Sequence, residues 1–314
     1  MLNRFYPIFL RVMKNSKTKL LIDQIVKIIF MIIGLICASS IVFIVFFIIF
    51  KGITPFIKTY SDGSKASLIN FLFSVNYSDG NYGVLGLIIN TLVIVLIVAL
   101  IALPISVLTS LFIVRIAPKK ISVFMQTIVE LLSSIPSIIF GLFGMGVINP
   151  LVRNLASAFN VQTAGGVSTL SVIIVLCMMI MPTITTLSIT SMKSVKENQI
   201  LASYALGASK SQTDFKIVIY EAKSGILASL ILGIGRGLGE ATAISMVCGG
   251  ANGISLGLFS PTSTLTYVMM QGFHESSGLS YDIRFSVGIV LIVIILLTNI
   301  VLNKVKKELC KNDK

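Results

Sequence analysis

The chain has 314 residues, of which 55% are hydrophobic and 12% are charged, and its mean hydropathy is +0.97. This composition is too apolar for a water-soluble globule with a polar shell, so it excludes a soluble protein and predicts an integral membrane protein. The net charge of +13 comes mostly from basic residues beside apolar runs, which indicates membrane topology rather than nucleic-acid binding.

Six apolar runs are each long enough to cross ~30 Å of hydrocarbon as a helix, which takes roughly 20 residues. In chain order they are 28–50, 84–114, 124–149, 167–191, 224–248 and 285–302. We therefore expect an all-α, polytopic membrane protein with about six transmembrane helices. Three prolines within these runs predict kinks that packed neighbours accommodate, namely Pro104, Pro136 and Pro182.

The basic residues predict the orientation. With both termini in the cytoplasm, 19 of the 25 lysines and arginines fall in cytoplasmic segments, five fall outside and Arg236 lies within a run. The first run follows a basic tail, as in a signal peptide, but it is too long for one and no cleavage site follows, so we expect a retained anchor. The expected segments are a cytoplasmic tail 1–27, a first transmembrane helix 28–50, an extracytoplasmic loop 51–83, a core 84–303 of five transmembrane helices with a cytoplasmic loop 192–223, and a cytoplasmic tail 304–314.

No cofactor or metal site is expected. The four cysteines are scattered without a C-x-x-C pair, which indicates neither a disulfide framework nor a metal site. The Walker A pattern G-x-x-x-x-G-K-[ST] does not occur, so we expect no nucleotide site of that kind and no enzymatic activity in this chain.

Two charged residues interrupt the fifth apolar run, in the stretch GIGRGLGEATAI at residues 233–244. Arg236 and Glu240 are one helical turn apart, so on a continuous helix they share a face and can pair. A charge at mid-bilayer costs roughly 2.5–3.5 kcal/mol on insertion scales. One interpretation is a structural ion pair between helices, which is weak evidence for stability. The other is a polar translocation path, in which arginine offers a forked donor to an oxyanion and Glu240 is its resting counter-ion or gate.

The glycines around Arg236 predict close helix packing. Gly233 with Gly237 and Gly235 with Gly239 form two small-x-x-x-small pairs, which allow another helix to approach closely. They lack the G-x-G-x-x-G spacing of a dinucleotide loop.

The stretch between the fourth and fifth runs is polar to amphipathic. Leu201, Ala202 and Ala205 favour a short amphipathic helix, and Gly207 is suited to end it. From the residues alone, this helix either lies on the lipid surface or contacts a partner.

Three segments together resemble a known family. The segment LASYALG at 201–207, followed after nine residues by Ile217, is similar to the E-A-A-x-x-x-G-x9-I-x-L-P coupling loop of bacterial ABC importer permeases. With ELLSSIPSIIFGLFG at 130–144 and GRGLGEATA at 235–243, the chain resembles the phosphate-importer permeases of the PstC and PstA type. Three features favour the PstC-like type, namely the segment ELLSSIPS, the basic N-terminal tail and the extracytoplasmic loop between the first two runs.

The resemblance implies a type I ABC importer permease fold and a set of partners. These are a second, PstA-like permease subunit, two cytoplasmic ATP-binding subunits and an extracytoplasmic phosphate-binding protein, in a bacterial cell membrane. In that family the arginine and glutamate of the fifth-run motif are regarded as essential to transport, and they map onto Arg236 and Glu240. The matching coupling-loop positions are Ala202, Ser203, Gly207 and Ile217.

The coupling loop departs from the family pattern at three positions. Leu201 stands for the glutamate, Ser203 for the second alanine and Tyr220 for the proline. The resemblance therefore carries over the docking role of the loop but not its individual ATPase contacts.

Other functions stay open at this point. A permease for sulfate or molybdate would use the same machinery. A secondary transporter or channel is disfavoured because the sequence shows no inverted repeat and few carboxylates within its runs. A scaffolding membrane protein is disfavoured by the arginine within the fifth run.

Overall fold

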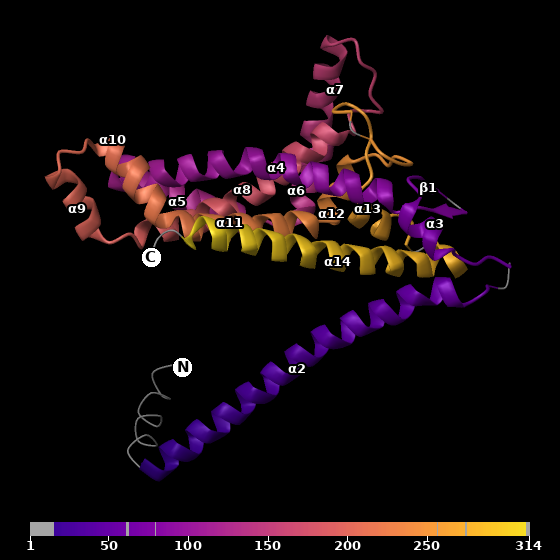
Figure 1. Cartoon of the computed structure of the whole chain (residues 1–314), viewed down its shortest axis with the longest axis horizontal. Helices are drawn as coiled ribbons and strands as arrows, with labels where there is room; N and C mark the ends of the chain where they lie inside the picture. The colour runs from indigo at the N-terminus through magenta and orange to yellow at the C-terminus, as the bar shows by residue number, and fades with distance from the viewer. Residues whose placement is uncertain (1–15, 61–62, 79, 256, 274, 312–314) are drawn as a thin grey trace, which may run out of the picture. The chain divides into compact units, whose positions relative to one another are not determined.

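A computed structural model describes residues 16–60, 63–78, 80–255, 257–273 and 275–311 of the chain (Figure 1). Part of the predicted N-terminal tail and the end of the C-terminal tail lie outside these residues. The chain divides into two units, residues 1–51 and 52–314, which are described separately. In the described residues, six helical stretches are long and apolar enough to cross a membrane, which confirms the predicted all-α, polytopic fold.

The helices and strands follow one another with short connections. They are α2 (Ser16–Ile57), α3 (Leu68–Phe73), β1 (Tyr77–Ser78), β2 (Asn81–Tyr82), α4 (Leu85–Leu111), η2 (Phe112–Ile116), α5 (Lys119–Ser134), α6 (Ser137–Phe143), η3 (Gly144–Ile148), α7 (Asn149–Ala158), α8 (Thr169–Lys193), α9 (Glu197–Ala205), α10 (Lys210–Thr213), η4 (Asp214–Val218), α11 (Ile219–Leu238), α12 (Thr242–Val247), α13 (Leu265–Met270) and α14 (Gly278–Leu309). The segments η2, η3 and η4 are π-helical turns continuous with their neighbours.

The first unit consists of most of α2. This helix begins and ends well outside the predicted 28–50, because hydropathy marks the hydrocarbon crossing and not the ends of the helix. The hydroxyls of Ser39 and Ser40 donate to carbonyl oxygens one turn earlier, at 2.7 and 2.9 Å. These bonds satisfy both side chains within an apolar stretch of the helix.

Helix α8 is the centre of the second unit. It packs against α4 and α11, and α11 also packs against α4 and α14 (Figure 1). In the most apolar stretch of α8, 67% of the residues are buried, against 39% or less for each other candidate span. Small polar side chains join these helices, as is common where water cannot compete for hydrogen bonds. Ser106 and Ser110 of α4 donate to the carbonyl oxygens of Met181 and Thr185 at 3.2 and 3.0 Å.

The packing prediction for the glycines is confirmed for one pair and wrong for the other. A Cβ on Gly233 would lie 2.8 Å from an Ile180 side-chain carbon, and a Cβ on Gly237 would lie 2.7 Å from another carbon of the same residue. These two glycines therefore let α11 lie directly on α8. Gly235 faces open space and Gly239 meets only ordinary contacts, because they point away from α8.

The predicted boundaries of the third run are wrong. The run 124–149 is divided into α5 and α6, and the candidate span is Ser137–Ala158. Proline at position 136 disfavours helical geometry at the residue before it, so α5 ends at Ser134 and α6 begins after Pro136. In contrast, α4 and α8 continue through Pro104 and Pro182.

The fifth run is also divided. The helical stretch extends from Lys210 to Leu238, and a short helix, α12, follows after a break at residues 239–241. The predicted run 224–248 therefore joins two helices. Its alternating glycines weaken the helix near this point, and hydropathy does not reveal the break.

The two ends of the second unit carry different structures (Figure 1). Helices α9 and α10 lie at one end, near the C-terminal end of α14, and α3, β1 and α13 lie at the other. The predicted loop 51–83 therefore contains the last turns of α2, the helix α3 and the hairpin. Its Tyr60 hydroxyl donates to the Asp282 carboxylate of α14 at 2.7 Å, and burial together with this bond raises the pKa of Tyr60 above its usual value.

The close approach of α11 and α8 predicts a difference between neighbouring glycines. Gly233→Ala should lower the midpoint of thermal unfolding in detergent, because overpacking a well-packed contact typically costs about 1–3 kcal/mol. Gly235→Ala is the matched control, since the added methyl group meets nothing within 4 Å. Equal midpoints for the two variants would contradict this packing.

Candidate functional site

Arg236 lies in the last turn of α11 and is half-buried. Its Nη1 donates to the Oγ1 of Thr183 in α8 at 2.9 Å. Thr183 differs from the threonines that follow it. The hydroxyls of Thr185 and Thr186 donate to the carbonyl oxygens of Met181 and Pro182 in their own helix, whereas the Thr183 hydroxyl accepts from the neighbouring helix. Thr183 therefore fixes the Arg236 guanidinium against α8.

Glu240 lies in the break between α11 and α12 and is 9% exposed. Its Oε1 accepts a hydrogen bond from the backbone N–H of Ala243 at 2.9 Å. This bond satisfies one of the N–H groups that the first turn of a helix leaves unpaired. Glu240 thus fixes the start of α12, and its side chain contributes to ending the longer helix.

The predicted pairing of Arg236 with Glu240 is wrong in this structure. Each side chain has its own partner, and in the described residues no ion pair joins them. The prediction assumed one continuous helix, on which residues four positions apart share a face. Because α11 ends at Leu238, that relation does not hold for Glu240.

The Arg236 guanidinium retains capacity for an anion. Its bond to Thr183 is its single hydrogen bond in the described residues and uses one of five N–H donors. A guanidinium with free donors and no carboxylate partner can bind a carboxylate or another oxyanion through two parallel hydrogen bonds. The site therefore combines a fixed positive charge with available donors, next to the closely packed α8 and α11.

The short helix α12 is held firmly beside this site. A Cβ on Gly141 of α6 would lie 3.0 Å from the Cα of Ala243, and a Cβ on Gly144 would lie 2.6 Å from a Val247 side-chain carbon. Such approach distances leave little freedom for α12 to shift relative to α6. Gly144 is also the last residue of the ELLSSIPSIIFGLFG motif. The glycines of this motif therefore allow close packing against α12, the helix that follows Glu240.

The helix predicted between the fourth and fifth runs is present as α9, which ends at Ala205. The apolar positions of that prediction, Leu201, Ala202 and Ala205, are exposed and do not pack against the rest of the chain. Gly207 follows with a φ of +82°, in the left-handed region that favours glycine. The Leu206 side chain is 90% exposed and the space around Gly207 is open. This end of α9 presents an uncovered apolar side chain at the surface of the chain.

The other predicted positions of this loop have different environments. Ala202 is exposed, and Ser203 is buried with its hydroxyl 2.9 Å from the Thr213 hydroxyl. Ile217 lies half-buried in η4. Ser203, which replaces an alanine of the family pattern, therefore joins α9 to α10 through a hydrogen bond that alanine could not form.

An ion pair that the sequence reasoning missed holds this region in place. The Nε of Arg115 in η2 lies 2.7 Å from Oδ1 of Asp214 in η4, and its Nη2 donates to the Tyr204 hydroxyl of α9 at 3.1 Å. The Asp214 side chain is 4% exposed and that of Arg115 is 22% exposed. The available signal was a lone aspartate within the basic stretch that was predicted to be cytoplasmic. The partner 99 positions away cannot be read from sequence spacing.

The sequence analysis predicted no metal site, which would need a group of His, Cys, Asp or Glu side chains. No such group of three or more occurs in the described part of the chain. The four cysteines are free.

The chain matches a known family and named relatives. The family model for the binding-protein-dependent transport system inner membrane component matches residues 116–307. The chain is 33% identical to the probable ABC transporter permease protein YqgH of Bacillus subtilis over 83% of both chains. It is 30% identical to the phosphate transport system permease protein PstC of Mesorhizobium japonicum and 28% identical to that of Xylella fastidiosa. These matches cover 74% and 72% of this chain, and 77% and 75% of the relatives.

Solved structures share the fold. A chain of a bacterial alginate ABC transporter in complex with an alginate-bound periplasmic protein aligns with a TM-score of 0.61 at 17% identity, covering 90% of this chain and 96% of that one. A chain of the inward-facing MetNI methionine ABC transporter aligns with a TM-score of 0.54 at 20% identity, covering 72% and 94%. At these identities the likeness establishes the fold alone.

The Arg115–Asp214 ion pair predicts a local change in stability. Asp214→Asn should increase amide hydrogen exchange across residues 197–218, because it leaves a partly buried guanidinium without its charged partner, at a cost of about 1–3 kcal/mol. The exchanged variant Arg115→Asp with Asp214→Arg should recover part of the protection. Lys216→Gln, an exposed change in the same segment, is the control. Unchanged exchange in Asp214→Asn would show that the ion pair does not hold this region.

Proposed function

The chain belongs to the family of binding-protein-dependent transport system inner membrane components, and we propose that it is the transmembrane permease subunit of an ATP-driven importer of inorganic phosphate. Its fold is that of the type I ABC importer permeases. Several relatives are phosphate transport system permease proteins of the PstC type. The observation that carries the proposal is Arg236, a half-buried arginine at the end of an apolar helix, with free donors and no carboxylate partner.

In this proposal Arg236 is the oxyanion contact of the translocation path. Phosphate presents several acceptor oxygens and a negative charge, which match the forked donors of a permanently protonated guanidinium. Thr183 positions that guanidinium through the 2.9 Å hydrogen bond. Glu240 acts indirectly, because its carboxylate holds the first turn of α12 rather than neutralising Arg236. The phosphate then supplies the counter-charge that no side chain provides.

We assign α9 and the exposed residues after it as the contact with the ATP-binding subunits. Leu206 is 90% exposed and adjoins the open Gly207, so this end of α9 offers an apolar residue to a cleft in a partner. The complete importer would contain a second, PstA-like permease subunit, two ATP-binding subunits and an extracytoplasmic phosphate-binding protein. In support, the fold is shared with an alginate transporter whose complex includes a periplasmic protein.

The same proposal sets the orientation in a bacterial cytoplasmic membrane. The end that carries α9 and α10 would face the cytoplasm with both termini, and the end that carries α3, the hairpin and α13 would face outward. The excess of lysine and arginine in the predicted cytoplasmic segments supports this direction. The C-terminal end of α14 lies at the α9 end of the second unit (Figure 1).

Another tetrahedral oxyanion is the alternative substrate. Sulfate offers acceptor oxygens that an arginine can bind in the same way, so Arg236 alone does not select phosphate. The relatives of the PstC type favour phosphate. A secondary transporter is less favoured, since the family to which the chain belongs is defined by dependence on a binding protein.

Uptake by the assembled importer tests the function. Proteoliposomes that contain this chain with its second permease and ATP-binding subunits should accumulate labelled phosphate when ATP and the phosphate-loaded binding protein are supplied. Omission of this chain should abolish uptake. Uptake of sulfate or molybdate at the same rate, or phosphate uptake without ATP, would contradict the proposal.

Substitutions at Arg236 and Thr183 test the path. Arg236→Lys should reduce phosphate uptake at least tenfold, because lysine keeps the charge but loses the fork, and a charge-assisted hydrogen bond is worth about 1.5–3 kcal/mol. Thr183→Val should reduce uptake by a smaller factor, and Thr183→Ser should retain it. Thr186→Val is the matched control, because its hydroxyl bonds to its own helix. Normal phosphate uptake by Arg236→Lys at normal expression would contradict this assignment and favour a structural role for Arg236.

Leu206 provides the sharper test of coupling. Leu206→Glu should leave insertion intact and abolish co-purification of the ATP-binding subunits, because it places a charge where an apolar contact is expected. Gly207→Glu should have the same effect, with added strain from its φ of +82°. Leu309→Glu, at the exposed end of α14, is the control for a new surface charge. Intact association in Leu206→Glu would identify α9 as a helix that lies on lipid.

A further inference from the structure

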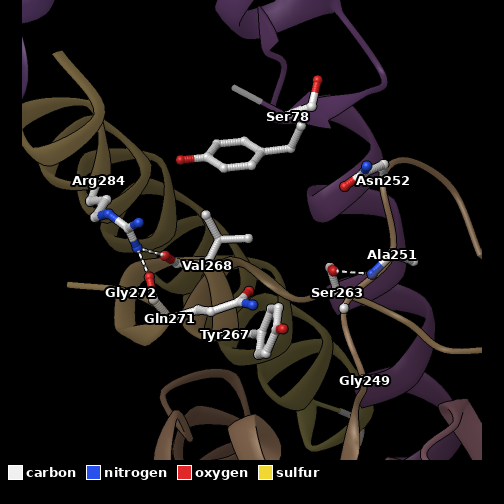
Figure 2. A pocket seen from close by; sticks show the side chains of 12 residues that line it. Ser78, Gly249, Ala251, Asn252, Ser263, Tyr267, Val268, Gln271, Gly272 and Arg284 are labelled. Carbon is white, nitrogen blue, oxygen red and sulfur yellow. Dashed lines mark hydrogen bonds between the residues drawn. The ribbon is translucent and has the colours of Figure 1, made fainter. Parts of the chain in front are cut away.

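A polar cavity of about 470 Å³ opens at the end of the second unit opposite α9 (Figure 2). Its walls come from the hairpin, the loop that follows α12, the helix α13 and the start of α14. The volume falls in the range of about 300–1,000 Å³ that is usual for small-molecule sites. Arg236, Thr183 and Glu240 are not among its lining residues, so it is distinct from the site described above.

The charge of the lining favours an anion. Among the described residues that line the cavity, Arg284 is the one that carries a charge, and none is a carboxylate. Neutral hydroxyl and amide side chains also line the cavity, from Ser78, Asn252 and Gln271. A single uncompensated positive charge among neutral hydrogen-bonding groups suits a small oxyanion.

The guanidinium of Arg284 is held in a fixed orientation. Its Nη1 donates to the carbonyl oxygens of Val268, at 2.7 Å, and of Gln271 (Figure 2). Its Nε donates to the carbonyl oxygen of Ser280 at 3.2 Å. These carbonyls belong to α13 and its end and to the first turn of α14. Nη2 has no hydrogen bond in the described residues, so its two N–H groups are free. Three bonds thus orient the fork and leave one side of it available.

Tyr267 adds a neutral donor to the cavity. Burial raises its pKa to about 12, so the phenol stays protonated at neutral pH. Its hydroxyl lies against the backbone of Gly250, where a Cβ would approach it to 2.6 Å. Gly250 has a φ of +75°, so glycine is required here by both conformation and space.

The cavity is linked through the chain to the first site. Gly249 and Gly250 follow Cys248, which caps the end of α12, and Glu240 holds the other end of that helix. Six helical residues extend over about 9 Å at 1.5 Å per residue. The cavity and the break beside Arg236 are therefore the two ends of one short, tightly packed element.

We propose that this cavity is an outer oxyanion-binding site, in which Arg284 holds phosphate before it reaches Arg236. The proposal rests on the proposed function, which supplies the substrate and the outward orientation of this end. Arg284 contacts the anion through Nη2, and the neutral groups of Ser78, Asn252 and Tyr267 complete its hydrogen bonds. The site acts by binding alone.

Protection from thiol labelling tests the site without relying on transport. In the purified importer without binding protein, Ser78→Cys is labelled by an impermeant thiol reagent, and labelling at position 78 is quantified by mass spectrometry. Inorganic phosphate should slow this labelling about tenfold at a concentration ten times its Kd, whereas chloride at equal ionic strength should not. Absence of protection would overturn the proposal.

Variants in the same background assign the protection to its residue. Arg284→Gln should abolish protection, and Arg236→Lys should retain it. Since Arg284 also bonds to the end of α13, Asn252→Asp is added, which places a negative charge in the cavity and leaves the bonds of Arg284 in place. It should weaken protection at least threefold, whereas Asn154→Asp, an exposed change on α7, should not. Full protection in both Arg284→Gln and Asn252→Asp would refute the assignment.

Two further measurements separate the explanations. Phosphate uptake by the wild-type importer tests the proposed function, so protection without uptake leaves the site intact and contradicts the transport assignment. Docking of the phosphate-loaded binding protein is measured for Asn252→Asp. A loss of docking with unchanged phosphate protection would identify the cavity as a protein contact and overturn the proposal.

Discussion

The contact between α8 and α11 is the constraint on which the rest of the second unit depends. Gly233 and Gly237 bring the two helices so close that the Ile180 side chain fills the space a Cβ would need. Only at that distance can Arg236 reach the Thr183 hydroxyl and can Ser188 and Ser229 share a hydrogen bond of 3.3 Å. Without water to compete, each such bond satisfies a polar group that apolar surroundings would otherwise penalise. The polar site therefore depends on the close packing of α8 against α11.

Much of the fold follows from the sequence, because hydrocarbon thickness sets the length of an apolar run. The number of spans was predicted in this way, whereas the short helix that Gly207 ends and the packing role of Gly233 were predicted from the local properties of glycine. The division of the fifth run into α11 and α12 was not predicted. Hydropathy reports whether a residue tolerates lipid, and Gly239, Glu240 and Ala241 leave no clear minimum in it. Their local hydrogen bonding ends the helix, and that depends on the position of the Ala243 backbone N–H.

The candidate site was predictable in its residues but not in its geometry. An arginine within an apolar run predicts a functional site, because a charge is costly in the membrane. Its partner, however, was a hydroxyl 53 positions away rather than the carboxylate four positions away. The same limit applies to Arg284, which the positive-inside count treated only as an outer basic residue. Its place in a cavity depends on three carbonyls from α13 and α14. Sequence spacing identifies chemistry within one helix, whereas these sites are formed between helices.

The ion pair between Arg115 and Asp214 has a mechanical consequence. Arg115 lies in the continuation of α4, and Asp214 lies in the segment that leads into α11. Tyr204 of α9 bonds to the same guanidinium, so three elements meet at one side chain. A force applied to α9 is therefore not absorbed by a loose connection. It reaches the adjoining ends of two spans at once through these bonds, and α11 carries Arg236 in its last turn, at its other end.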